Sequence, residues 1–280
     1  RILGIISPFI VIVFFILMFM DNKYFFKKNI LKVVTFLSLV IFFTILFWPY
    51  LWESPLNNFI TVFKNLSNFD EYIYNFYFSE YIFAQNIPWH YPIVWLGITT
   101  PLFYIFLFIA GCIVVSKKFY TNILKIEKNE KNNFWSNEKE LQDLIFFTTF
   151  LVPLAIVIFL NSTLYDGWRH LYFIYPSFLL ISLSGLHYIK ISFFKKNLNI
   201  LLTIIMLLVS PTFIWMIKNH PYQYLYFNIF AGKDFNNNFK MDYWGLSNAK
   251  ALEYIAKEEN EIVIVGSIST TDLNISKNFL

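Results

Sequence analysis

The stretch LKVVTFLSLVIFFTILFWPYL, residues 31–51, carries a single charged side chain, Lys32. Because an α-helix rises about 1.5 Å per residue, about 20 apolar residues cross the ~30 Å hydrocarbon layer of a bilayer. Five further runs are similarly long and apolar: residues 2–20, 92–115, 144–160, 171–188 and 200–217. A water-soluble core cannot bury six such runs, so the sequence predicts a helical protein that crosses a membrane repeatedly.

The overall composition agrees with this class of protein. Of the 280 residues, 57% are hydrophobic and 14% are charged, against about 25% charged in a soluble domain. The net charge of +4 is too small and too dispersed to indicate a nucleic-acid partner. The lone cysteine, Cys112, lies in an apolar run, so the sequence offers neither an internal disulfide nor a cysteine-based metal site.

We predict an all-α polytopic membrane protein with about six transmembrane helices and an interfacial helix, followed by the start of a small α/β extracytoplasmic domain. The transmembrane domain is expected over residues 1–217, with an interfacial loop at 52–91, and the second domain over residues 218–280. The chain begins at Arg1 rather than Met and ends just after a strand-like stretch at 261–267. We therefore expect both ends to be cut from a longer protein, which would truncate the second domain.

Lysines are concentrated in alternate loops, and basic loops remain on the cytoplasmic side of a membrane. They recur in residues 21–29, in residues 116–141 and after the fifth run, whereas loop 52–91 has Lys64 as its one basic residue and loop 161–170 has Arg169. We therefore expect a multi-pass protein of the cell (inner) membrane. Loops 52–91 and 161–170 and the C-terminal tail are then extracytoplasmic.

Each of these three extracytoplasmic stretches could hold catalytic or binding residues, and the first is the loop 52–91. Within it, FDEYIYNFYFSEYIF, residues 69–83, has aromatic and apolar residues at helical spacing, which predicts a helix in the plane of the interface. The sequence PWHYP at 88–92 follows. It forms either a proline-bounded turn anchored by aromatic rings, or part of a polar cavity lined by Trp89, His90 and Tyr91.

The second stretch, NSTLYDGWRH at 161–170, brings charged groups to the end of an apolar helix, where they are costly unless paired, solvated or used. Asp166 and Arg169 could form a structural ion pair across one helical turn. Alternatively, the guanidinium fork of Arg169 and the imidazole of His170 suit an anionic headgroup such as a phosphate or diphosphate.

The third stretch is the tail after residue 218. Ser247 is a plausible N-cap for a helix over 248–257, and residues 261–265 resemble a strand. Asp242 could contact substrate, or it could serve as a local cap or turn residue. The sequence contains no phosphate-cradling glycine-rich loop, no zinc-binding helix and no nucleophile elbow. The polar residues lie at one membrane face, which favours an interfacial enzyme over a conduit.

Four segments in this order resemble the GT-C superfamily of membrane glycosyltransferases, which includes bacterial protein O-mannosyltransferase and aminoarabinose transferase relatives. They are PWHYPIVWLGITTP at 88–101, YDGWRH at 165–170, HPYQY at 220–224 and DYWGLS at 242–247. The resemblance covers about residues 48–255. His90 stands where the family pattern usually has Tyr.

The resemblance implies an integral-membrane glycosyltransferase that moves a sugar from a polyprenyl-phosphate donor to a lipid, glycan or protein acceptor. Arg169 and His170 match the family motif and would contact the donor phosphate. The catalytic carboxylate is expected upstream of Arg1. Supporting or cavity residues would be Tyr165, Asp166, Trp89, His90, Tyr91 and Asp242. No cofactor is implied, and the need for a divalent metal stays open.

Two other function classes remain. A polymerase or ligase of lipid-linked polysaccharide would also work at the outer face with Arg and His. A transporter or flippase would instead require an inverted internal repeat with broken helices meeting at mid-membrane. A non-catalytic scaffold subunit is the third alternative.

Overall fold

The computed structural model describes residues 2–21, 23–67, 72–128, 134–258 and 264–266. The chain forms two compact units that interleave along the sequence. The first unit comprises Arg1–Tyr72, Phe103–Ser162 and Arg169–Leu201, and the second comprises Ile73–Leu102, Thr163–Trp168 and Leu202–Leu280. The predicted domain boundary at residue 217 stays a prediction.

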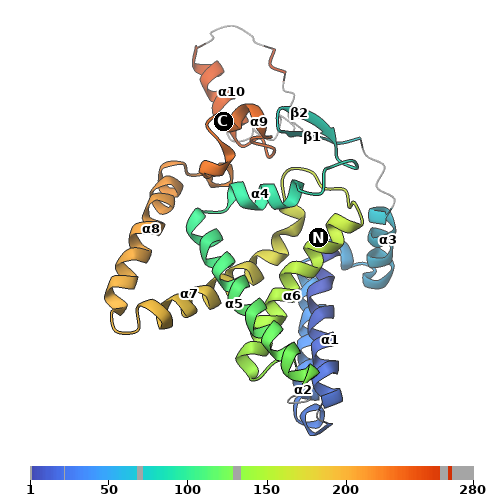
Figure 1. Cartoon of the computed structure of the whole chain (residues 1–280). Helices are drawn as coiled ribbons and strands as arrows, with labels where there is room; N and C mark the ends of the chain where they lie inside the picture. Colours follow the sequence, from blue (N-terminus) through green and yellow to red (C-terminus); the bar gives the residue numbers. More distant parts are fainter. Residues whose placement is uncertain (1, 22, 68–71, 129–133, 259–263, 267–280) are drawn as a thin grey trace. The chain divides into compact units, whose positions relative to one another are not determined.

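The first unit is a bundle of helices. Its elements are the 3-10 helices η1 (Ile2–Ile5), η2 (Pro49–Leu51) and η3 (Arg169–Ile174) and the helices α1 (Ile6–Asp21), α2 (Lys23–Leu46), α3 (Pro55–Ser67), α5 (Leu102–Glu127), α6 (Glu138–Phe159) and α7 (Tyr175–Phe193). Helix α1 packs against both α2 and α6, and α6 also packs against α7 (Figure 1). Helix α8 (Leu198–Lys218) begins in this unit and continues into the second one.

Helices α5 and α7 cross closely at a pair of glycines. A Cβ atom added to Gly111 would lie 2.1 Å from the carbonyl oxygen of Ile181, and one added to Gly185 would lie 2.3 Å from that of Leu107. Neither position can hold a side chain without moving backbone. Glycine is therefore required here for close approach, as is common where helices associate within a membrane.

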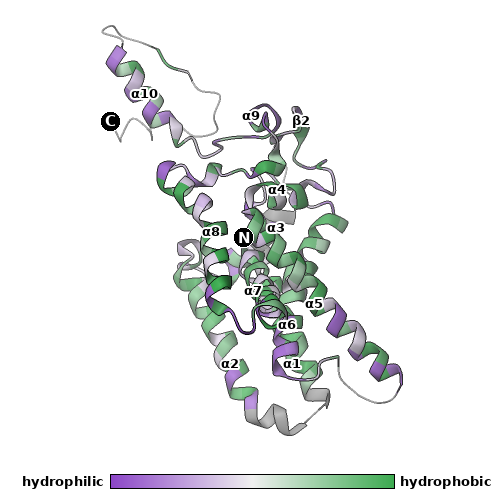
Figure 2. Cartoon of the chain, turned by 60° about the vertical axis from the view of Figure 1, so that its left-hand side comes forward, coloured by the Kyte–Doolittle hydropathy of each residue, from purple (hydrophilic) through white to green (hydrophobic). Residues whose placement is uncertain are grey.

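Within the part of the chain that the structure describes, five helices are long and apolar enough to cross a membrane: Asn29–Leu46, Leu102–Glu127, Glu138–Phe159, Arg169–Phe193 and Leu198–Lys218. Hydrophobic residues predominate along the long helices, whereas α10 mixes hydrophilic and hydrophobic residues (Figure 2). The protein is therefore a helical multi-pass membrane protein with the lipid bilayer as its partner. The first predicted run forms a shorter apolar helix, Ile6–Met18, so the predicted total of six spans stays open.

The apolar run at 92–115, which was predicted as one span, is broken in the structure. Helix α4 (Tyr91–Thr99) ends before Pro101, and α5 begins after it. Thr100 has an extended backbone, with φ −99° and ψ 135°. Proline has no N–H to donate and disfavours the helical conformation of the residue before it, so the helix stops there.

The second unit contains the two-stranded sheet of the described residues. Strands β1 (Tyr74–Tyr77) and β2 (Glu80–Phe83) pair antiparallel, with Tyr74 opposite Phe83. The other elements are α4, most of α8, η4 (Gln223–Leu225), η5 (Ile229–Ala231), α9 (Phe235–Asn238) and α10 (Ser247–Glu258). The hairpin neighbours α9 (Figure 1), and a bridge joins Tyr77 to Phe239 just after that helix.

The prediction of an interfacial helix over 69–83 is wrong for the residues that the structure describes, because they form this hairpin. Aromatic residues at alternate positions satisfy a strand period as well as a helical one, and burial alternates along β1, with Asn75 and Tyr77 buried. Phe78 and Ser79 both have positive φ, 50° and 64°, which closes the two-residue turn. Residues 69–71 lie outside the described part of the chain.

The predicted helix over 248–257 is confirmed by α10. Ser247 is the first residue of this helix rather than the residue before it, and its hydroxyl donates a hydrogen bond to the carboxylate of Asp242. Most of the predicted strand at 261–265 lies outside the described residues, and residues 264–266 have no regular secondary structure.

Candidate functional site

The second unit holds a buried polar loop at residues 164–168, within the segment that resembles the glycosyltransferase motif. Asp166 and Gly167 are both buried and both left-handed, with φ of 55° and 75°. A Cβ on Gly167 would meet the Trp95 ring at 3.4 Å. Glycine adopts this conformation without strain, and Asp is one of the few other residues found there. The Asp-Gly pair therefore sets the path of the loop.

Asn75 of β1 makes three hydrogen bonds, two of them to this loop and one to Tyr91. Its Nδ2 donates to the carbonyl oxygen of Leu164 at 2.8 Å, and its Oδ1 accepts from the backbone N–H of Asp166 at 3.1 Å. The same Oδ1 accepts from the hydroxyl of Tyr91 at 3.0 Å. Asn75 is 1% exposed, so a lost bond would leave a buried polar group unsatisfied.

Tyr91 and Thr99 connect the loop to the two ends of α4. The Tyr91 hydroxyl accepts a hydrogen bond from the backbone N–H of Gly167 at 3.1 Å, and burial raises the pKa of this phenol above its ordinary value. The Thr99 hydroxyl accepts from the indole Nε1 of Trp168 at 2.9 Å. The PWHYP and YDGW segments, far apart in the sequence, thus share one buried network.

An ion pair completes the network. The Lys240 ammonium lies 2.6 Å from Oδ1 of Asp166, and the two side chains are 25% and 10% exposed. Lys240 is positioned by its backbone, whose N–H donates to the carbonyl oxygen of Phe76 in β1. Both charges are largely removed from water, so their attraction is screened less than that of an exposed pair.

His90 lies beside the same hairpin. Its Nδ1 is 2.7 Å from the hydroxyl of Tyr77, a residue that is 1% exposed, and burial raises the pKa of that phenol. The ring of Trp89 stands edge-on to the imidazole and is 65% exposed. His90 and Tyr91 are therefore bound into the hairpin and loop, as in the anchored-turn alternative, and their contact with a substrate stays a prediction.

The broken end of α4 is capped from the tail after α8. The Nδ2 of Asn228 donates to the carbonyl oxygens of Gly97 and Thr100 at 2.7 and 2.6 Å. Its backbone N–H donates to the carbonyl oxygen of Ile98 at 2.8 Å. These are the carbonyls that a helix end leaves without intrahelical partners, and here they are satisfied within the protein.

Asp242 has a local role in this structure. Its carboxylate accepts hydrogen bonds from the hydroxyls of Tyr224 and Ser247 and from the backbone N–H groups of Leu246 and Ser247. Burial alone would raise the pKa of Asp242, but these bonds to its charged form outweigh burial and hold the pKa below its ordinary value. Asp242 thereby fixes the start of α10 to the segment after α8, and substrate contact by it stays a prediction.

Arg169 and His170 belong to the first unit. They are the first residues of η3, which leads into α7, and both are half-buried. The Nε of Arg169 and the Nε2 of His170 are themselves buried atoms. Tyr165 is also half-buried and immediately precedes the Asp-Gly turn. The predicted contact of Arg169 and His170 with a donor phosphate stays a prediction.

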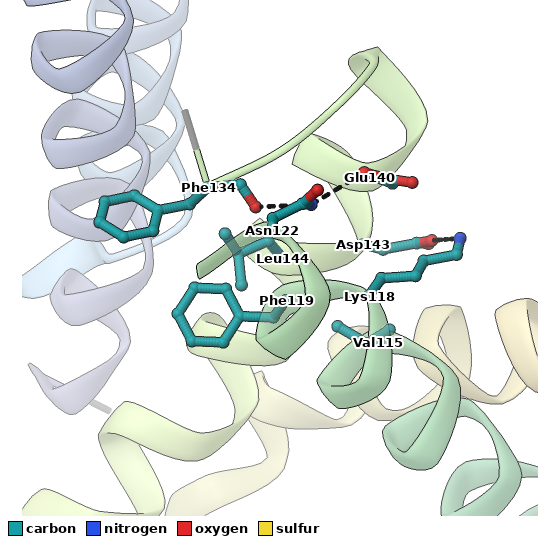
Figure 3. Close-up of a pocket in the computed structure, with 8 residues that line it drawn as sticks. All are labelled: Val115, Lys118, Phe119, Asn122, Phe134, Glu140, Asp143 and Leu144. Atoms are coloured by element: carbon teal, nitrogen blue, oxygen red, sulfur yellow. Dashed lines mark hydrogen bonds and ion pairs between the residues drawn. The ribbon is translucent and has the colours of Figure 1, made fainter. Parts of the chain in front are cut away.

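A second polar cluster joins α5 and α6 in the first unit (Figure 3), and Ser184 of α7 bonds to it. Lys118 lies 3.6 Å from Oδ2 of Asp143, while the Ser184 hydroxyl donates to Oδ1 at 2.5 Å. Beside them, Nδ2 of Asn122 donates to the Glu140 carboxylate at 3.1 Å. The adjoining cavity of about 10 Å³ is the size of one water molecule. The cluster thus has no room for a sugar or a lipid headgroup, and it is best described as a polar contact between helices.

Sequence reasoning missed Asn75, Lys240 and Asn228, which build the network in the second unit. Lys240 and Asn228 have no local pattern that marks them, and the one local signal for Asn75 is that it is an amide within an aromatic strand. Among the described residues, no group of three or more His, Cys, Asp and Glu side chains is placed to hold a metal ion. Comparison with family models, curated proteins and solved structures found no match to this chain. The class of the protein therefore rests on its fold, that of a helical multi-pass membrane protein.

Proposed function

We propose that this chain belongs to an integral-membrane glycosyltransferase that takes a sugar from a polyprenyl-phosphate donor and transfers it at the extracytoplasmic face. The observation that carries the proposal is the convergence of motif segments in the second unit. Tyr91 and Thr99 from PWHYPIVWLGITTP bond to Gly167 and Trp168 of YDGWRH. Asn228, four residues after the HPYQY segment, bonds to Gly97 and Thr100 of the first of these segments. Segments that resemble one family in sequence thus support one another in space.

The network suits a site that needs a rigid loop. Left-handed Asp166 and Gly167 are held by Asn75, Tyr91 and Lys240, so the loop at 164–168 has a fixed backbone. Preorganised donors stabilise a developing charge better than donors that must reorient during the reaction.

The proposed reaction is a direct displacement at the anomeric carbon. A bond forms between that carbon and the acceptor oxygen or nitrogen, while the bond to the lipid phosphate oxygen breaks. The acceptor proton passes to a carboxylate expected upstream of Arg1. The guanidinium of Arg169 and the imidazole of His170 would neutralise the departing phosphate.

Replacing Arg169 by Ala in the full-length protein tests this assignment. Loss of one charge-stabilising group is expected to lower the transfer rate from a polyprenyl-phosphate sugar by roughly 100-fold. Lys233→Ala is the matched control, because Lys233 is an exposed cation of the second unit outside the network. An Arg169→Ala protein that remains folded and transfers sugar at the wild-type rate would remove Arg169 from the phosphate site.

A transporter is the second candidate, because the apolar run at 92–115 is interrupted between Thr99 and Leu102, and transporters use interrupted helices around a substrate. The carbonyls at this break, however, are already occupied by Asn228. A transporter would leave such carbonyls open for an ion or substrate, so this observation favours the transferase.

A further inference from the structure

Helix α3 carries an exposed apolar face in the first unit. Leu56, Ile60 and Phe63 are 80%, 51% and 57% exposed. They follow one another at intervals of four and three residues, so they lie on one side of the helix. Asn57, Thr61 and Lys64 fall on another side and are exposed as well. Helix α3 is therefore amphipathic, and the structure leaves part of its apolar side uncovered.

The length of α3 excludes a membrane span. At about 1.5 Å per residue, its 13 residues extend roughly 20 Å, less than the ~30 Å of a hydrocarbon layer. An amphipathic helix of this length can instead lie in the plane of the interface, with its apolar side among the acyl chains.

Two hydrogen bonds hold α3 at the end of a membrane-spanning helix. The candidate span Asn29–Leu46 in α2 ends nine residues before α3 begins. The indole of Trp52 donates to the carbonyl oxygen of Ile45 at 2.8 Å, and Nδ2 of Asn58 in α3 donates to that of Tyr50 at 2.6 Å. The chain between the helices is thus folded back on the end of α2.

The residues of this connection are those found at the level of lipid headgroups. Phe47, Tyr50 and Trp52 are 77%, 49% and 61% exposed, and they continue the exposed apolar surface of α2 toward α3. Tyr and Trp prefer this level because their rings are apolar and their polar groups remain in contact with water. The lipid-facing surface of the protein therefore extends from α2 through η2 to α3.

We propose that α3 lies in the membrane interface at the end of α2, with Leu56, Ile60 and Phe63 inserted among the lipid acyl chains. Lys64 is the single charged residue of α3. The attachment of α3 to the membrane therefore rests on burial of its apolar side chains and does not depend on anionic lipids.

The test uses single cysteines in the full-length protein with Cys112 replaced by Ala, reconstituted in phosphatidylcholine vesicles. Residues 60 and 63 report the apolar side, and their neighbours 61 and 64 are matched controls on the polar side. Each cysteine carries an environment-sensitive fluorophore. It is quenched either by nitroxide groups on the lipid acyl chains or by iodide in the water.

Labels at Ile60 and Phe63 are expected to be quenched several-fold more by the lipid nitroxides than labels at Thr61 and Lys64, and several-fold less by iodide. Adding phosphatidylglycerol should leave this pattern unchanged. Equal iodide quenching at positions 60 and 61 would overturn the proposal. Protection of position 60 from both quenchers would mean that protein covers α3, which also overturns it. A label at Leu56 repeats the measurement if a variant fails to reconstitute.

Discussion

Replacing Lys240 by Met tests the electrostatic support of the loop at 164–168. The substitution keeps most of the side-chain length and removes the charge that faces Asp166 at 2.6 Å. At an effective dielectric constant of about 20, the attraction at this distance is roughly 6 kcal/mol. Desolvation of the two groups cancels part of it. Because the Asp166 side chain is 10% exposed, water replaces the attraction of the lost Lys240 charge poorly.

We expect Lys240→Met to lower the free energy of unfolding by about 3 kcal/mol, the lower end of the range for breaking a buried pair. The measurement is denaturant unfolding of the full chain in detergent micelles, followed by tryptophan fluorescence. Hydrogen exchange should localise the effect to the backbone N–H groups of Asp166 and Gly167, which bond to Asn75 and Tyr91.

Two controls make the measurement specific. Lys233→Met removes an exposed cation of the same unit and is expected to change stability by less than about 0.5 kcal/mol. The double variant Lys240→Met with Asp166→Asn removes both charges and should recover part of the loss, as a double-mutant cycle would report. If Lys240→Met lowers the free energy of unfolding no more than Lys233→Met does, and hydrogen exchange in the loop is unchanged, the ion pair does not support the loop.

Two further predictions concern packing and pH. Gly185→Val should destabilise the chain by at least about 2 kcal/mol in thermal unfolding, since its Cβ would meet the Leu107 carbonyl oxygen. Gly97→Ala should be tolerated, because a Cβ there has nothing within 4 Å. Equal effects of the two substitutions would contradict the close crossing of α5 and α7. The pKa of Asp242 is lowered in the folded state, so its contribution to stability is present above the ordinary value of 3.8 and is lost as the pH falls through the folded value. Exchange of the Ser247 amide should therefore accelerate in that acid range in the wild type, while Asp242→Asn shows no such acid-dependent step.

The hairpin at 74–83 illustrates where prediction from sequence failed. Its run of aromatic residues is compatible with both the helical and the strand period, so local pattern does not choose between them. The choice follows from partners elsewhere in the chain, because Tyr77 bridges to Phe239 and the Ser79 hydroxyl donates to the carbonyl oxygen of Asn237. Context of this kind commonly overrides strand or helix preference.

The break between α4 and α5 is an intermediate case. Pro101 is visible in the sequence, but the apolar run continues past it, and the length of the run favoured a single span. A kinked helix and a broken helix have the same local signature. The carbonyl oxygens of Gly97 and Thr100 have no partner within a continuous helix. Asn228, which is 128 or more residues away in the sequence, donates hydrogen bonds to both, so the helix can end there.

Membrane crossing could be read from the order of residues alone, because hydropathy and helix length are properties of contiguous segments and need no partner. Helix α10 could be predicted for the same reason, from its local apolar stripe. The polar network around Asp166 could not. Asn75 and Lys240 lie 91 and 74 residues from it, and neither has a local feature that marks its partner. Burial in the folded chain is what makes these hydrogen bonds and this ion pair obligatory, and burial of that kind exists only once distant segments have packed together.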